Sequence, residues 1–167
     1  PRSPQGSLPA HPRDFKTPNY GMKEWPDLFT NRQLVALTTF SDLVTEAREQ
    51  VLADALESGR PEGERLADGG SDAAAYADAV TTYLAFAISK LADWSSTICS
   101  WISPIEGVRS TFARQAIPMV WDYTEINPFS SSVGNFESHV VWVASVVDRL
   151  SPVGAGHAEV TQADASS

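Results

Sequence analysis

The fold of this chain is decided by residues 30–57, which read TNRQLVALTTFSDLVTEAREQVLADALE. Thr30 and Gln33 match a capping box, in which the hydroxyl accepts a bond from a free backbone N–H and the Gln side chain reaches back. Gly59 and Pro61 then end a long helix, because neither residue favours a helical interior. Between these signals, apolar residues recur at three- and four-residue steps and predict one buried helical face: Leu37, Phe40, Val44, Ala47 and Val51.

A second amphipathic helix is predicted to follow a polar, glycine-rich loop at 58–72. Two such helices joined by one loop are typical of an antiparallel hairpin. We therefore expect Phe40 on the first helix to pack against Tyr83 and Ala87 on the second. The second helix begins at 71–72, and its predicted apolar face consists of Tyr76, Val80, Tyr83, Ala87, Leu91 and Trp94.

The whole pattern predicts a mainly α chain in three parts: an irregular arm over 1–19, a helical region over 20–150, and a loop and strand over 151–167. Five prolines in the arm block regular helix there. Residues 95–107 show no clear period. The elements predicted after them are a helix over 109–116, a helix from Pro118 to Tyr123, a turn over 127–134, a helix over 135–150 and a strand over 157–162.

The composition is that of a globular protein, with 43% hydrophobic residues in 167. A formal net charge of −9 opposes non-specific attraction to phosphate, so the overall charge does not point to nucleic acid. The single cysteine excludes an internal disulfide and is compatible with a reducing cytoplasm. No apolar run approaches the ~20 residues that cross a bilayer, so we expect a cytoplasmic protein without a membrane partner. Because the first residue is Pro1 and not Met, we expect an internal part of a longer protein.

The side chains that could bind a metal or act as a nucleophile are scattered along the chain. His11, His139 and His157 have no ligand-type partner three or four residues away, so no metal site is expected. Cys99 has no cationic neighbour in sequence to lower its pKa, which favours a buried, inert thiol. Asp122 and Glu125 lie three apart on a predicted helix, where solvated charges are a commoner explanation than acid–base chemistry.

The turn Asn127-Pro128-Phe129 has a partial likeness to a catalytic motif. Amino-methyltransferases use Asp/Asn-Pro-Pro-Tyr/Phe, whose side-chain oxygen and a backbone carbonyl accept hydrogen bonds from the target amine. The second proline is missing here, and a predicted helix, not a strand, precedes the turn. We therefore interpret Pro128 as a helix stop.

Three arginines beside aromatic residues are the candidates for contact with DNA. Arg32 follows Phe29, and Arg109 and Arg114 bracket Phe112. Arginine can bind phosphates or base edges, although capping and helix-surface roles would also explain all three positions. We expect a structural role for Arg32 and a DNA contact for Arg114.

Three stretches, 20–44, 94–101 and 109–129, carry a resemblance to a known family. The chain resembles the large prokaryotic adenine-specific DNA methylases that contain a zinc ribbon, whose N-terminal region is labelled a domain of unknown function. The resemblance spans about 15–167, and its most specific segments are Leu-Phe-Thr-x-Arg-Gln-Leu from Leu28 and Phe-Ala-Arg-Gln-Ala-Ile-Pro-Met-Val-Trp-Asp from Phe112.

The resemblance implies a position between the two halves of a catalytic site. In that family a glycine-rich cofactor loop precedes the first segment, and Asp-Pro-Pro-Tyr follows a segment like the one at 159–165; neither motif occurs in this sequence. The resemblance thus implies a helical insertion that ends in a short strand of an α/β methyltransferase sheet. It places Asp164 where a strand-end carboxylate contacts the adenine of the cofactor.

The function implied for the parent protein is transfer of a methyl group from S-adenosylmethionine to an exocyclic amine of a flipped-out DNA base, adenine N6. The partners would be DNA and the remainder of the methyltransferase domain, in a restriction–modification setting. This chain alone would be inert, without catalytic residues or a bound cofactor. The alternative is an independent helical module that binds DNA or a partner protein of a defence or regulatory system.

Overall fold

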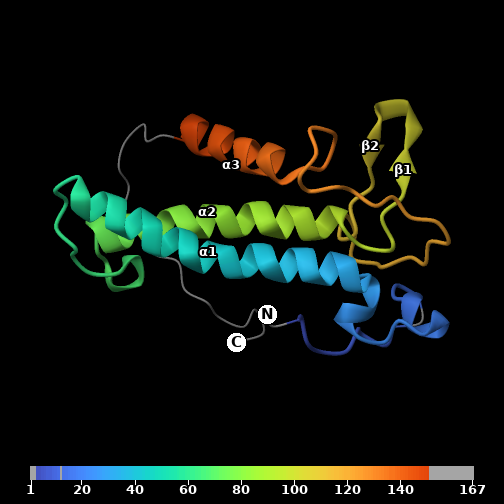
Figure 1. Cartoon of the computed structure of the whole chain (residues 1–167). Helices are drawn as coiled ribbons and strands as arrows, with labels where there is room; N and C mark the ends of the chain where they lie inside the picture. The colour runs from blue at the N-terminus through green and yellow to red at the C-terminus, as the bar shows by residue number, and fades with distance from the viewer. Residues whose placement is uncertain (1–2, 12, 151–167) are drawn as a thin grey trace.

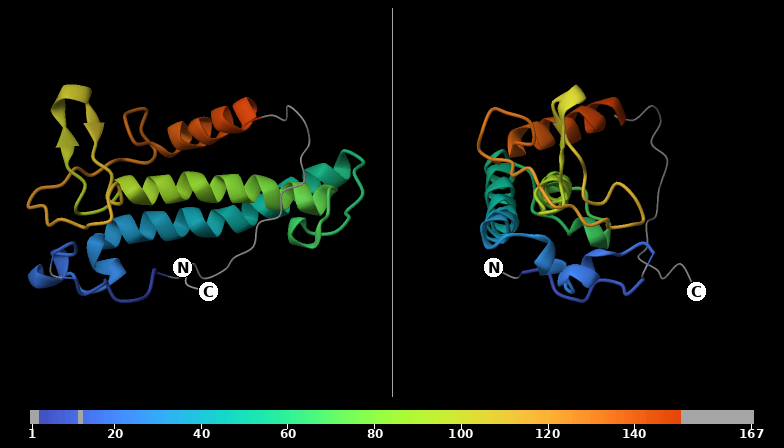
Figure 2. Two further views of the ribbon diagram at one scale, coloured as in Figure 1. Left: turned by 180° about the vertical axis from the view of Figure 1, so that it is seen from behind. Right: turned by 90° about the vertical axis from the view of Figure 1, so that its right-hand side faces the viewer.

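The computed structural model describes residues 3–11 and 13–150. Within these residues the chain is mainly α, as predicted, with three α-helices and one small antiparallel sheet. The helices are α1 (Asn31–Glu57), α2 (Ala73–Trp94) and α3 (Phe136–Leu150). Figure 1 shows that α1 and α2 form an antiparallel hairpin and that α2 lies between α1 and α3. The same order is seen from behind in the left view of Figure 2.

Helix α1 begins and ends at the predicted signals. The Thr30 hydroxyl accepts the Gln33 N–H at 3.2 Å, and the Gln33 side-chain oxygen accepts the Thr30 N–H at 2.7 Å. At the other end, Gly59 has φ +88°, the left-handed conformation that glycine adopts without steric cost. The predicted helix over 30–57 is therefore confirmed, including its cap.

Helix α2 confirms the predicted hairpin and the predicted burial of Ala87 and Leu91, but Tyr76 of the predicted face is exposed. Small side chains form most of the buried face: Ala73, Ala74, Ala77 and Ala87, together with Leu91. Tyr83, predicted to be part of it, is 43% exposed. The prediction gave too much weight to aromatic residues, whereas alanine lets two long helices approach closely. Phe40 of α1 contacts Phe129 and Phe136, at ring-centroid distances of 5.5 and 4.5 Å.

The loop between α1 and α2 is fixed by one carboxylate. Asp78 on α2 accepts hydrogen bonds from Arg48 of α1 and from Arg65 of the loop, both at 2.7 Å. The Arg65 guanidinium, together with Arg48, holds the pKa of Asp78 well below its ordinary value. Close packing adds to this constraint, since a Cβ on Gly70 would lie 2.0 Å from the Glu64 carbonyl oxygen. The glycine-rich composition of the loop thus reflects a tight structure.

Helix α3 matches the prediction over 135–150 and packs on α2 around a buried histidine. His139 is enclosed by Trp94 and Trp142, with edge-to-face centroid distances of 5.2 and 5.6 Å. Neither ring nitrogen of His139 has a hydrogen-bond partner among the described residues. Burial, followed by the charge of Lys90, lowers the pKa of His139, so the ring is neutral at pH 7.

The predicted helices over 109–116 and from Pro118 to Tyr123 are wrong. A small hairpin of β1 (Trp101–Ile102) and β2 (Gly107–Val108) precedes this segment, which then continues as turns and extended chain. Two of its backbone N–H groups bond to carbonyls that are distant in sequence. Thr111 N–H donates to the Asp93 carbonyl at 2.8 Å, and Ile117 N–H donates to the Asp14 carbonyl at 2.9 Å. These bonds replace the local ones that a helix would need.

The N-terminal arm has little regular structure, and its described residues pack against the rest of the chain. Leu8 forms a core cluster with Leu28, Ile98 and Ile117. Two short 3-10 helices, η1 (Thr17–Tyr20) and η2 (Trp25–Leu28), lead into α1. The predicted strand over 157–162, with His157 and Asp164, lies outside the described residues.

In the part of the chain that the structure describes, no helix combines the length and apolar character that crossing a membrane requires.

Candidate nucleic-acid interface

The structure brings two of the three candidate DNA-contacting arginines together. Arg109 and Arg114 line one cleft of about 330 Å³, and three hydroxyl residues, Ser100, Ser110 and Thr111, line it as well. None of the described residues that line this cleft is acidic, although the chain has a net charge of −9. We call this site the arginine cleft. Arg32 lies at a different site.

Both guanidinium groups of the arginine cleft are available to a ligand. Arg109 is exposed, and its Nε makes one hydrogen bond of 3.3 Å to the Ser100 hydroxyl. Arg114 is exposed as well and makes no hydrogen bond or ion pair with any described residue. A planar guanidinium can donate two parallel hydrogen bonds to phosphate oxygens, and hydroxyl groups can donate a further one. The cleft therefore has the donors that an anionic backbone requires.

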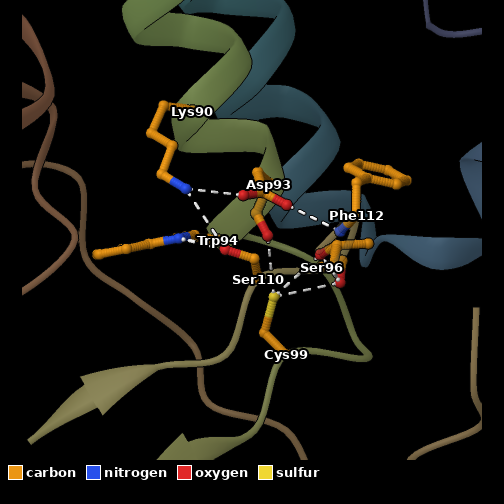
Figure 3. Close-up of polar contacts among 8 residues, drawn as sticks. Lys90, Asp93, Trp94, Ser96, Cys99, Ser110 and Phe112 are labelled. Carbon is orange, nitrogen blue, oxygen red and sulfur yellow. Dashed lines mark hydrogen bonds and ion pairs between the residues drawn. The ribbon is translucent and has the colours of Figure 1, made fainter. Parts of the chain in front are cut away.

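The last turn of α2 positions the segment that carries these arginines (Figure 3). One carboxylate oxygen of Asp93 accepts the Phe112 N–H at 2.8 Å, and the other accepts Lys90 Nζ at 2.9 Å. The indole N–H of Trp94 donates to the Ser110 hydroxyl at 3.0 Å. Residues 110–112 are thus tied to the helix end by both side-chain and backbone groups.

The Asp93 carboxylate is charged in this environment. Burial raises the pKa of Asp93, but the hydrogen bonds from Lys90, the Phe112 amide and Ser110, together with the charge of Lys90, outweigh burial. The net pKa lies below the ordinary value, so Asp93 is ionised at neutral pH and accepts both bonds. Lys90 also lies over the ring of Trp94, with its nitrogen 4.9 Å from the centroid, which fixes the ammonium group between the two residues.

A buried cluster of one thiol and two hydroxyls lies beneath this network (Figure 3). Ser96 and Thr111 share a hydrogen bond of 2.7 Å, and the Cys99 sulfur lies 3.1 Å from the Thr111 hydroxyl. The Cys99 thiol also donates to the Asp93 carbonyl at 3.4 Å. The predicted burial of Cys99 is confirmed. Through its contacts with Thr111 and Asp93, this residue joins residues 110–112 to the end of α2.

Arg32 lines a second cleft, of about 430 Å³, between the start of α1 and residues 125–129. Its Nε donates to a Glu125 carboxylate oxygen at 3.0 Å, and its Nη2 contacts the other oxygen, which makes the pair bidentate. These hydrogen bonds and the charge of Glu125 raise the pKa of Arg32. Arg32 therefore has a carboxylate partner, unlike Arg114. The expected helical face shared by Asp122 and Glu125 does not exist, because residues 118–125 are not helical.

The turn at Asn127-Pro128-Phe129 forms part of the wall of this second cleft. The side-chain oxygen of Asn127 accepts the Phe129 N–H at 3.0 Å, and its carbonyl accepts the Ser130 N–H at 3.1 Å. No helix precedes Pro128, so the interpretation of this residue as a helix stop is wrong. Pro128 occupies the first corner of a turn, a position that its fixed φ favours.

The described residues contain neither a cluster of metal-ligating side chains nor a glycine-rich loop that leads from a strand into a helix. No group of three His, Cys, Asp or Glu side chains among them could hold a metal ion. The two-residue strands β1 and β2 are joined by a short 3-10 turn, not by a glycine-rich loop leading into a helix. Asp164, the residue that the resemblance assigns to the cofactor, lies outside the described part.

Comparison with family models, with curated proteins and with solved structures finds no match to this chain.

Proposed function

We propose that this chain is a helical, DNA-contacting region of an S-adenosylmethionine-dependent, adenine-specific DNA methyltransferase. The arginine cleft carries this proposal, since Arg109 and Arg114 both line it and no described lining residue is acidic. Elsewhere the negative net charge opposes contact with phosphate, so the local positive site would direct the DNA backbone to this end of the molecule.

The methyltransferase part of the proposal rests on the resemblance, and the fold adds one supporting observation. The three stretches that carry the resemblance each contribute one residue to the same core cluster: Leu28, Ile98 and Ile117. The first two stretches are also joined through the backbone, because Thr97 N–H donates to the Leu28 carbonyl at 2.8 Å. The resemblance therefore concerns one packed unit and not scattered matches.

In this proposal, the methyl-transfer chemistry is carried out by the rest of the protein. S-adenosylmethionine would supply the methyl group, and an Asp-Pro-Pro-Tyr motif outside this chain would orient the target amine. The described residues would bind the DNA backbone through the arginine cleft.

The test uses the full-length protein that contains this chain. We expect it to transfer a labelled methyl group from S-adenosylmethionine to adenine-containing DNA. Changing Arg114 to Ala should weaken DNA binding and lower the slope of log K against log salt by about 0.9 for a lost duplex phosphate contact. Arg149→Ala is the matched control, because Arg149 is exposed on α3 and away from the cleft. Absence of methyl transfer, or an unchanged salt slope for Arg114→Ala, would contradict the proposal.

One observation favours the alternative of an independent partner-binding module. Exposed apolar residues of α2 and α3 border a groove of about 640 Å³: Tyr83, Phe86, Trp142, Val146 and Leu150. Contiguous apolar surface of this kind marks protein contacts. In the methyltransferase proposal the remainder of the enzyme covers this groove. If the full-length protein binds DNA through Arg114 but transfers no methyl group, the binding module is the better account.

A further inference from the structure

We propose that the groove between α2 and α3 binds a small molecule that has an apolar chain and a carboxylate head. We call this site the α2–α3 groove. Its volume of about 640 Å³ lies in the range of small-ligand sites, about 300–1,000 Å³. Such sites occur preferentially between domains, so a ligand here is compatible with a cover formed by the rest of the enzyme. The proposal is independent of the contact with DNA, because no described residue lines both this groove and the arginine cleft.

The apolar part of the α2–α3 groove follows one stripe of α3. The lining residues of this helix recur at steps of three and four, the spacing of one helical face, and end at Leu150. Tyr83 and Phe86 of α2 contribute exposed aromatic rings to the same groove. From His139 to Leu150 the helix rises by about 16 Å, at 1.5 Å per residue. The groove is thus elongated, which suits an extended chain better than a compact ring.

A buried imidazole in the lining of the groove lacks hydrogen-bond partners. His139 is 1% exposed, and neither ring nitrogen makes a hydrogen bond with any described residue. The Gly134 backbone, which acts on the pKa of His139, can meet only one of the two nitrogens. Buried polar side chains nearly always have a partner. Because the neutral ring carries one N–H donor, an acceptor on a ligand would supply the missing partner.

The charged group of the groove lies at the same end as His139. Lys90 and His139 both contact the Trp94 ring, with the ammonium nitrogen 4.9 Å and the imidazole centroid 5.2 Å from its centroid. Asp93 and Ser110 accept two of the three ammonium donors, which leaves the third for a ligand (Figure 3). Lys90 is the one charged residue among the described residues that line the groove. The lining therefore favours an anionic head at this end.

The two parts of the groove together select an amphipathic anion. A purely apolar ligand would leave His139 without an acceptor, and a small polar anion would leave the exposed rings and valines uncovered. A carboxylate has two oxygens, so it can accept hydrogen bonds from Lys90 and His139 at once. Its aliphatic chain would then lie along α3 toward Leu150. An aliphatic carboxylate therefore matches the polar and the apolar lining.

The test measures binding of decanoate and dodecanoate to the full-length protein by isothermal titration calorimetry, below the concentrations at which these ligands form micelles. Affinity should rise about fourfold for each added methylene, as expected when an apolar chain is buried. Dodecanol, which has no charge, should bind roughly tenfold more weakly than dodecanoate. His139→Phe keeps a ring but loses the donor, so it should bind dodecanoate roughly tenfold more weakly than the parent.

Val146→Glu should abolish binding of dodecanoate, because it places a carboxylate in the apolar part of the groove. Val141→Glu is the matched control, since Val141 is exposed to a similar degree on α3 and does not line the groove. Equal losses in these two variants would overturn the proposal, as would dodecanol or His139→Phe matching the affinity of the parent for dodecanoate. Absence of saturable binding by the parent would overturn it too. If Val146→Glu then changes the oligomeric state, the groove belongs to a second copy of the protein.

Discussion

The two ends of the α1–α2 hairpin, which lie far apart in Figure 1, are held by different kinds of contact. At the loop end, Arg48, Arg65 and Asp78 join the helices and the loop through ion pairs. At the opposite end, Leu28 belongs to an apolar cluster, and Asp93 ties residues 110–112 to the last turn of α2. Both clefts lie at this second end.

This difference separates stability from the proposed function at one end and couples them at the other. The ion pairs at the loop end involve none of the residues that line the arginine cleft or the second cleft, between the start of α1 and residues 125–129. At the opposite end, Thr111 belongs to the buried hydroxyl cluster and also lines the arginine cleft. Changes at the loop end should therefore alter the free energy of unfolding alone, whereas changes at the opposite end should alter DNA binding as well.

The largest effect is expected for Leu28→Ala. Leu28 is fully buried in the cluster with Leu8, Ile98 and Ile117, so truncation leaves a cavity among residues from three parts of the chain. The free energy of unfolding should fall by about 2–5 kcal/mol, as measured by urea denaturation. Leu56→Ala is the control, because Leu56 is exposed on the last turn of α1 and should change stability by less than about 0.5 kcal/mol. Equal losses of unfolding free energy in the two variants would show that the apolar cluster stabilises the fold no more than an exposed leucine does.

A smaller effect is expected for Asp78→Ala at the loop end. Removing the carboxylate leaves Arg48, Arg65 and the Leu66 N–H without their acceptor, which should cost about 1–3 kcal/mol of unfolding free energy. The salt slope of DNA binding by the full-length protein should stay that of the parent. A lower slope in Asp78→Ala would contradict the separation of the two ends.

Helix α1 was predictable because its signals are local in sequence. The capping pair of Thr30 and Gln33 spans one helical turn, and Gly59 ends the helix within two residues of its last position. The buried face of α2 was predicted less well, since hydrophobic size does not tell whether tyrosines or alanines will meet the neighbouring helix. Both residues belong to the predicted face, yet Ala87 is buried and Tyr83 is exposed.

The clefts were less predictable because their geometry depends on partners far along the chain. The sequence singled out Arg109 and Arg114 by their aromatic neighbour, and the structure places them in one cleft. Helices were predicted over 109–116 and from Pro118 to Tyr123, whereas the backbone bonds to Asp93 and Asp14 decide against them. Arg32 pairs with Glu125, which lies 93 residues away, and no local sequence pattern predicts such a pair.

A third, smaller effect is expected for Thr111→Val, which tests the coupling at the cleft end. The substitution keeps the shape of the side chain and removes the hydroxyl that bonds to Ser96 and Cys99. Unfolding free energy should fall by about 1 kcal/mol. DNA binding should weaken as well, because residues 110–112 lose one of their ties to α2. An unchanged DNA affinity, with the stability loss present, would show that the arginine cleft does not depend on this cluster.

The smallest effect is expected in the pH dependence of stability, because His139 and Asp78 lose their contributions over different pH ranges. Burial and the charge of Lys90 lower the pKa of His139 below its ordinary value of 6.5, so the unfolded chain takes up a proton there before the folded chain does. Stability from His139 is thus full above about pH 6.5 and is lost as the pH falls below it. Asp78 also has a lowered pKa, and its contribution is lost only below its ordinary value of 3.8.

Melting temperatures between pH 7.5 and 5 distinguish these two groups. The parent should melt at progressively lower temperature below about pH 6.5, and His139→Phe, which keeps a ring between Trp94 and Trp142, should flatten this part of the profile. Asp78→Asn should leave the slope between pH 7.5 and 5 unchanged and flatten the profile only below about pH 4. A slope in His139→Phe as steep as that of the parent would mean that another group titrates in this window. Burial of His139 between α2 and α3 would then not be the cause of the pH dependence.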